Sequence, residues 1–144
     1  MPVVFVGHGT PLNAIEDNEF TNYWKSISKK FNKPKAILSI SAHWVTNNGS
    51  FIQKEKEPRQ IYDFYGFPKR LYDVKYPAKG NMDISEKIIN ILDLEIDNNW
   101  GIDHGSWSVL SRIYEDADIP VIQLSIDFNK SFKEHFEFAK KLEF

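Results

Sequence analysis

Three short runs of β-branched and other apolar residues constrain the fold of this chain more than any other feature. They occupy residues 3–6, 36–41 and 120–125. The first is unbroken and the other two are mostly apolar, so each predicts a buried strand. Amphipathic segments separate them, which predicts helices over about 18–31, 84–92, 107–114 and 132–142. This alternation predicts an α/β fold, with a mostly parallel or mixed sheet flanked by helices.

Smaller signals complete the expected order of elements. Short strands are expected at 50–53 and 94–97, where β-branched residues follow turn signals. Asp83 is the expected cap of the helix over 84–92, and Ser131 with Glu134 has the spacing of a capping box before the last helix. Residues 54–80 contain several prolines and glycines, so we expect a long irregular segment, which in a compact domain is usually functional.

The composition restricts the kind of protein that this chain can be. Its 144 residues predict one domain, 1–144. The net charge of -2 gives no basic excess for nucleic-acid binding. No apolar run is long enough to span a membrane, and the N-terminus lacks the pattern of a signal peptide. Cysteine is absent, which excludes disulfides and thiolate metal sites and agrees with a cytoplasmic location.

Two histidines follow predicted strands directly. His8 comes after the run at 3–6, and His43 comes after the run at 36–41. If these strands are parallel neighbours, both side chains emerge at their carboxyl ends, where open α/β sheets bind ligands. Two imidazoles at that edge suit a divalent metal such as zinc or iron. In the alternative interpretation, each histidine only forms a hydrogen bond within its own turn.

A third histidine, His104, lies in a glycine-bounded loop before a predicted helix. Because an unperturbed imidazole has a pKa near about 6.5, His104 is a candidate general acid or base, and it is also a candidate metal ligand. Asp103 is then the candidate residue that orients its ring. Alternatively, Asp103 caps the helix and His104 has no role. The remaining histidine, His135, is expected on the surface of the last helix.

The segment 61–68 is too aromatic for an ordinary solvated connection. Tyr62, Phe64, Tyr65 and Phe67 lie within it. They are candidates for the wall of a pocket that stacks on a planar aromatic substrate. The alternative is a loop that folds back onto the core.

Six motifs occur in order along the chain and together resemble one known family. They are Phe-Val-Gly-His-Gly-Thr-Pro at 5–11, Ile-Ser-Ala-His-Trp at 40–44, Tyr-Asp-Phe-Tyr-Gly-Phe-Pro at 62–68, Tyr-Pro-Ala at 76–78, Gly-Ile-Asp-His-Gly-Ser-Trp at 101–107 and Pro-Val-Ile-Gln-Leu-Ser at 120–125. The chain closely resembles extradiol ring-cleaving dioxygenases of the DOPA 4,5-dioxygenase type, in the LigB (class III) superfamily.

The resemblance implies a non-haem metal enzyme that opens a small aromatic diol, a catechol, with O2. It implies that His8 and His43 bind the metal, and that His104 lies beside it as acid or base or as a further ligand. The expected metal is Fe(II) for activity, although Zn(II) also suits such a site. The aromatic loop and Thr10 of the first motif are then expected to contact the substrate.

The resemblance also implies that family members continue well past residue 144 and supply a further strand and a further histidine to the metal. We therefore expect this chain to lack one ligand and part of the sheet. Exposed sheet edge and apolar helix surface would then favour a homo-oligomer. A non-catalytic metal-binding or interaction protein that retains the fold is the main alternative function. A metal-dependent hydrolase is disfavoured, because the sequence shows no carboxylate paired with the histidines.

Overall fold

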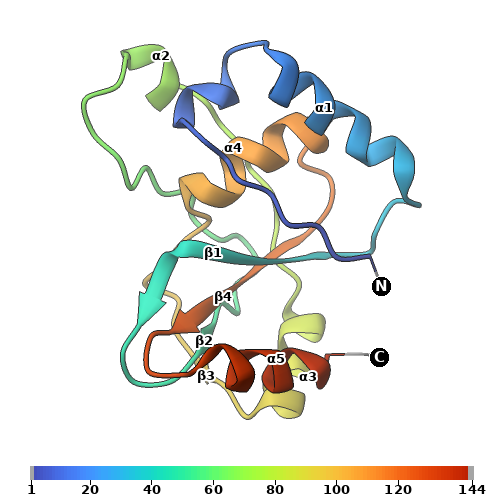
Figure 1. Cartoon of the computed structure of the whole chain (residues 1–144), viewed down its shortest axis with the longest axis vertical. Helices are drawn as coiled ribbons and strands as arrows, with labels where there is room; N and C mark the ends of the chain where they lie inside the picture. The colour runs from blue at the N-terminus through green and yellow to red at the C-terminus, as the bar shows by residue number, and fades with distance from the viewer. Residues whose placement is uncertain (1, 143–144) are drawn as a thin grey trace.

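A four-stranded mixed sheet lies between two layers of helices in the computed structural model, which describes residues 2–142 (Figure 1). The strands are β1 (Ile37–Thr46), β2 (Phe51–Ile52), β3 (Glu95–Ile96) and β4 (Val121–Asp127). Their order is β1-β4-β2-β3. β1 is parallel to β4 and β2 is parallel to β3, whereas β2 is antiparallel to β4. The predicted α/β fold with a mixed sheet is confirmed.

The helices cover both sides of this sheet. They are η1 (Pro11–Ala14), α1 (Glu19–Ile27), η2 (Ser28–Lys30), α2 (Lys69–Tyr72), α3 (Met82–Leu92), α4 (His104–Ile113) and α5 (Phe132–Lys140). In Figure 1, α1, α2 and α4 lie above the strands, and α3 and α5 lie below them. No helix within residues 2–142 has the length and the apolar character that crossing a membrane requires.

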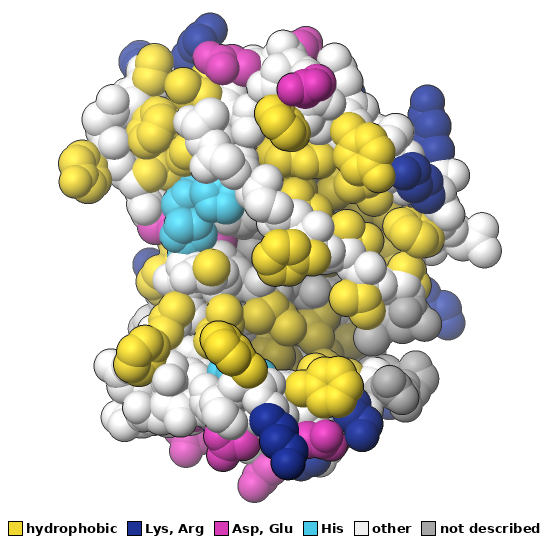
Figure 2. Space-filling model, in the orientation of Figure 1, with side chains coloured by type: hydrophobic (Ala, Val, Ile, Leu, Met, Phe, Trp, Pro, Cys, Tyr) yellow, Lys and Arg dark blue, Asp and Glu magenta, His cyan; other side chains and the backbone are white. Residues whose placement is uncertain are grey.

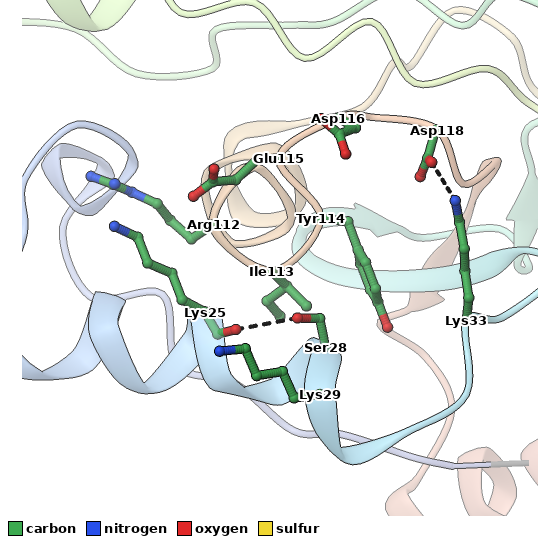
Figure 3. A pocket seen from close by; sticks show the side chains of 10 residues that line it. All are labelled: Lys25, Ser28, Lys29, Lys33, Arg112, Ile113, Tyr114, Glu115, Asp116 and Asp118. Atoms are coloured by element: carbon green, nitrogen blue, oxygen red, sulfur yellow. Dashed lines mark hydrogen bonds and ion pairs between the residues drawn. The ribbon is translucent and has the colours of Figure 1, made fainter.

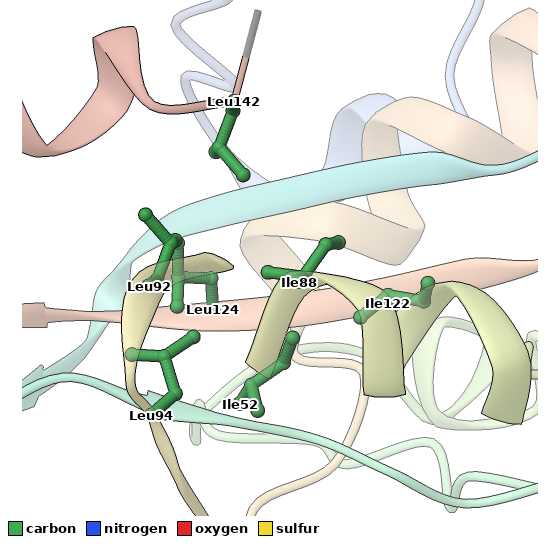
Figure 4. Close-up of a cluster of buried hydrophobic side chains, with 7 residues drawn as sticks. All are labelled: Ile52, Ile88, Leu92, Leu94, Ile122, Leu124 and Leu142. Atoms are coloured by element: carbon green, nitrogen blue, oxygen red, sulfur yellow. The ribbon is translucent and has the colours of Figure 1, made fainter. Parts of the chain in front are cut away.

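Two apolar clusters hold these layers to the sheet. The lower one joins α3 to β2 and β4 (Figure 4), through Ile52, Ile88, Leu92, Leu94, Ile122, Leu124 and Leu142. The upper one joins α4 to β4 and to the long irregular segment, through Leu71, Tyr76, Ala78, Ile102, Trp107, Leu110 and Val121. The upper cluster therefore supports the first turn of α4, which begins at His104.

The predicted buried strand at residues 3–6 is wrong. These residues belong to no strand, and Val3 and Phe5 are 86% and 100% exposed. A strand forms only where a neighbouring strand forms hydrogen bonds with its backbone groups. Within residues 2–142 no strand pairs with this segment. Val6 alone packs inward, against Trp24 and Ile27 of α1.

Three boundaries also differ from the sequence prediction. α3 is capped by Asn81 rather than Asp83, because the Asn81 side chain accepts the hydrogen bond from the Ile84 amide. α4 begins at His104, three residues before the predicted start at 107. β1 continues through His43 to Thr46, with an irregularity in its register against β4 between Ile40 and Val45. His43 therefore lies inside a distorted strand.

Candidate metal centre

Three histidines from distant parts of the chain meet where α4 begins. His8 follows the N-terminal segment, His43 lies in the irregular part of β1, and His104 is the first residue of α4. Nε2 of His8 lies 2.9 Å from Nε2 of His43. One nitrogen atom of each ring lies within 4.8 Å of the others. The structure thus brings together all three residues that the sequence singled out as metal ligands.

The spacing of these nitrogen atoms suits a divalent metal. Imidazole nitrogens bind zinc at about 2.0–2.1 Å, so two of them lie about 3.3 Å apart at the tetrahedral angle and about 2.9 Å apart at a right angle. The 2.9 Å between His8 and His43 matches the right angle and is shorter than the tetrahedral distance. Nδ1 of His8 is buried without a hydrogen-bond partner among the described residues. Three imidazoles form a donor set that fits Fe(II) or Zn(II).

Metal binding also requires neutral imidazole, and the surroundings of His8 favour that form. Burial lowers the pKa of His8, and the nearby rings of His104 and His43 lower it further. A protonated ring at this place would lose hydration and face two other imidazoles. The His8 nitrogens therefore stay available to a metal over a wider pH range than those of a solvated histidine.

Asp63 is the carboxylate of this cluster. Its Oδ1 lies 2.9 Å from Nδ1 of His104, and the same oxygen accepts a hydrogen bond from the His104 amide. Its Oδ2 lies 3.9 Å from Nδ1 of His43. Since the Nδ1 atoms of both rings face Asp63, their Nε2 atoms are left for a metal or a substrate.

The ionised form of Asp63 is favoured in this position. Its burial alone would raise the pKa, but the contact with the His104 ring and the hydrogen bond from the His104 amide hold the pKa below its usual range. Asp63 is not among the site residues that the sequence pattern predicted. The signal that could have found it is a lone acidic residue inside the aromatic segment 61–68.

Asp103 acts on the helix rather than on the His104 ring. Its carboxylate accepts hydrogen bonds from the Ser106 amide, the Trp100 indole and the Gln123 side chain, at 2.9–3.1 Å. Its own amide donates to Gln123 Oε1 at 2.9 Å. The expectation that Asp103 orients the imidazole is therefore not met, and Asp63 takes that place. Asp103, which is fully buried, ties the start of α4 to β4.

Gly105 lets the first turn of α4 lie directly on β1. A Cβ atom at this position would come within 2.7 Å of His43 Cδ2 and 2.8 Å of Ser41 Oγ. One residue further on, the hydroxyl groups of Ser106 and Ser39 are 2.7 Å apart. This close contact between α4 and β1 sets the distance between the imidazole rings of His104 and His43.

The predicted substrate-contacting residues separate into two groups. Tyr62, Phe64 and Phe67 fold back onto the upper apolar cluster, as the alternative interpretation of this segment proposed. Among them, Phe64 places its ring edge-on to His104, with 5.3 Å between the ring centroids.

The second group is exposed. Tyr65 is 91% exposed, and Thr10 caps η1 through its hydroxyl group. His135 lies apart from the cluster, with its Nε2 atom 3.0 Å from the Asp127 carbonyl oxygen. This position agrees with the prediction that His135 has no role in the site.

A separate cleft lies between α1 and the end of α4 (Figure 3). It is lined by lysines and Arg112 together with Glu115, Asp116 and Asp118, and none of its lining residues belongs to the histidine cluster. Lys33 pairs with Asp118 across it. Because its charges are mixed and paired, this cleft does not compete with the histidine cluster as the candidate site.

The α/β scaffold thus gathers three imidazoles and a carboxylate where α4 begins beside β1. This arrangement defines a class of protein, the candidate non-haem metal proteins. The family model described as the catalytic LigB subunit of aromatic ring-opening dioxygenase matches residues 2–143. The chain therefore belongs to the LigB family.

Individual relatives agree with this assignment. The chain is 44% identical over 146 residues to the 4,5-DOPA dioxygenase extradiol of Escherichia coli K12, a match that covers 99% of the chain and 54% of the relative. It is 40% identical over 150 residues to the enzyme of the same name from Beta vulgaris, covering 96% of the chain and 54% of the relative.

A solved structure extends the similarity to the fold. The crystal structure of an uncharacterized protein from Escherichia coli K12 superposes with a TM-score of 0.71 at 37% identity. That match covers 89% of this chain and 48% of the other. The chain spans about half the length of the relatives that it matches.

Proposed function

We propose that this chain carries the metal centre of an extradiol ring-opening dioxygenase that acts on a catechol with O2. The observation that supports this most strongly is the cluster of His8, His43 and His104, with 2.9 Å between the first two rings. Membership of the LigB family supplies the reaction class. The DOPA dioxygenases among its relatives suggest a catechol with an amino-acid side chain as the first substrate to test.

The proposed division of roles follows from the geometry. His8 and His43 would hold the metal through Nε2. Bound Fe(II) would supply open coordination positions and a redox-active metal for a reaction in which the catechol provides the electrons that reduce O2, whereas Zn(II) would occupy the site without redox chemistry. His104 directs Nδ1 at Asp63, so its Nε2 is the atom that would accept a proton from a substrate hydroxyl group and later return it.

Aromatic residues next to the cluster would position the substrate. The Phe64 ring lies edge-on to His104 and would contact a planar ring that is bound beside this histidine. Tyr62 and Phe67 would hold Phe64 in place from the core side, since all three pack in the same cluster. Thr10 and Tyr65, which are both exposed, would contact only the rim of a bound catechol.

Oxygen uptake is the direct test. The chain is loaded with Fe(II) without oxygen, and uptake is followed with a panel of catechols that includes DOPA. Uptake with a new visible chromophore is the expected result. H8A is expected to lose tight metal binding, H104A to keep most of the metal but not turnover, and H135A to match the unaltered chain. Stoichiometric metal in H8A would show that the ligand assignment is wrong.

A non-catalytic metal-binding protein is the second candidate. The observation that favours it is the histidine cluster itself, because three imidazoles can hold a metal whether or not turnover follows. Folded, iron-loaded protein that binds catechols but consumes no O2 would support this second function. Complete loss of metal in H104A would in turn make His104 a ligand rather than an acid or base.

A further inference from the structure

His8 is the member of the histidine cluster that regular structure does not hold. It lies in a segment without helix or strand and is half-buried, whereas His104 is buried on α4. Figure 2 shows histidine side chains exposed together at the left of the molecule. Metal ligands must be placed within about 0.5 Å. Because packing covers His8 only in part, its placement depends on the hydrogen bonds that hold its segment.

Asn13 makes the contact that holds the His8 backbone. Its side-chain amide donates a hydrogen bond to the His8 carbonyl oxygen at 2.9 Å, and its Oδ1 accepts one from Asn18 Nδ2 at 2.8 Å. Asn13 is only 6% exposed, so a lost bond would leave a polar group buried without a partner. Gly9 packs tightly here, because a Cβ atom at Gly9 would come within 3.1 Å of Asn13 Nδ2. Asn13 therefore closes the turn that begins at His8.

Arg112 ties this turn to α4, the helix that carries His104. Its Nε donates a hydrogen bond to the Asn13 carbonyl oxygen and its Nη2 donates one to the Glu16 carbonyl oxygen, both at 2.9 Å. Its Nη1 lies 3.2 Å from Oδ1 of Asp17, and the arginine side chain is 12% exposed. A planar guanidinium that donates to three acceptors has a fixed orientation. These contacts therefore hold the η1 segment at a fixed distance from α4.

We infer that Arg112 is a positioning residue of the metal centre, which acts on His8 through Asn13. Arg112 donates to the Asn13 carbonyl oxygen, and the Asn13 side chain donates to the His8 carbonyl oxygen. His104 lies at the other end of the same helix, about 12 Å away at 1.5 Å per residue. α4 therefore carries one histidine at its start and holds the segment of a second at its end. The inference rests on the metal centre proposed above but not on its catalysis.

Lys25 shows what an ordinary surface ion pair would contribute at the same place. Its Nζ lies 2.9 Å from the same oxygen of Asp17, and its side chain is 37% exposed. Lys25 and Arg112 line the same cleft (Figure 3). Exposed ion pairs contribute little, so loss of Lys25 should leave the His8 segment in place. Lys25 is therefore the matched control for Arg112.

The test is a double-mutant cycle between R112M and H8A in the full chain. Methionine keeps much of the apolar length of arginine but removes its donors. Zinc affinity is measured by competition with a chromophoric chelator, and urea unfolding of the metal-free proteins shows that each variant is folded. R112M is expected to lower zinc affinity by about 10–100-fold, as removal of a supporting contact of a ligand does. K25M is expected to bind zinc as the unaltered chain does.

The H8A background separates positioning from a general loss of stability. A residue that acts through His8 has nothing to position once that imidazole is absent, so R112M is expected to leave the residual zinc affinity of H8A unchanged. An equal loss of zinc affinity in both backgrounds would overturn the inference. An unchanged affinity in R112M, or an equal loss in K25M, would also overturn it.

Hydrogen exchange in the metal-free protein separates this inference from the proposed function. The amides of Asn13, Ile15 and Glu16 donate hydrogen bonds within the turn. R112M is expected to speed their exchange, whereas K25M is not. If the unaltered chain binds no zinc, the proposed function fails, and exchange alone then decides whether Arg112 holds the His8 segment. Unchanged exchange in R112M would overturn the inference.

Discussion

Substitution of Gly105 by alanine tests whether the close contact between α4 and β1 sets the metal centre. The new Cβ would lie 2.7 Å from His43 Cδ2, and 3.4 Å is the lower end of ordinary contact. One of the two atoms must therefore move by about 0.7 Å or more. The backbone of α4 is held by the buried pairing between Asp103 and Gln123, whereas the His43 side chain is partly exposed. We expect the imidazole of His43 to move.

The effect on folding should be small, because two contributions oppose each other. Alanine is favoured over glycine within a helix by about 1 kcal/mol. Overpacking at a tight contact costs about 1–3 kcal/mol. The free energy of unfolding should therefore fall by about 2 kcal/mol at most. Metal ligands, in contrast, must be placed within about 0.5 Å, so displacement of His43 should lower metal affinity by about 10–100-fold, the loss typical when a supporting contact of a ligand is removed.

The assay is competition for Zn(II) against a chromophoric chelator, with urea unfolding of the metal-free protein measured in parallel. Gly7→Ala is the matched control, because a Cβ at Gly7 meets no atom within 4 Å, although Gly7 is the neighbour of His8. G7A should bind zinc as the unaltered chain does. Equal zinc affinity in G105A and G7A, with both folded, would refute the proposed link between the α4 contact and the position of His43.

Three further predictions concern single groups. Asp63→Asn should lower zinc affinity by about 10–100-fold in the same competition assay, because the neutral amide no longer offers a carboxylate to His104 Nδ1; unchanged affinity would contradict the role given to Asp63. Because burial lowers the pKa of His8, the folded metal-free protein takes up a proton less readily than the unfolded chain. The free energy of unfolding should therefore fall as the pH drops below about 6.5, and H8A should reduce this slope in urea titrations at several pH values. Tyr76→Phe should keep or raise thermal stability, by about 1 kcal/mol, since the buried Tyr76 hydroxyl has no hydrogen-bond partner among the described residues; a clear loss of stability would show that this hydroxyl is satisfied.

Local sequence patterns predicted the elements whose formation depends on local signals. α1 and α5 have capping boxes and amphipathic spacing, and both helices begin at the residues that follow their caps. β4 is rich in apolar residues and is buried along nearly its whole length. The same logic failed for residues 3–6. There the residue types favour a strand, but no neighbouring strand is present within the described chain to satisfy the backbone.

The position of Asp63 could not be predicted from periodicity, because it depends on the path of an irregular segment. The stretch between β2 and α2 returns to the start of α4 through a parallel bridge between Gln60 and Ile102. The Ile61 carbonyl then accepts the Trp107 indole hydrogen bond. These contacts join residues about forty positions apart, and together they bring Asp63 to His104. Neither contact has a signature in the local pattern of residues.

His8 differs from the other two histidines of the cluster in how it is held. His43 and His104 belong to a strand and a helix that the core supports, but His8 lies on a segment without regular structure. Asn13 donates a hydrogen bond to the His8 carbonyl at 2.9 Å, and Val6 packs against α1. A metal held by His8 and His43 would therefore join this segment to β1. A metal that binds only the folded state stabilises that state. Metal binding should therefore order the N-terminal segment and the histidine cluster together.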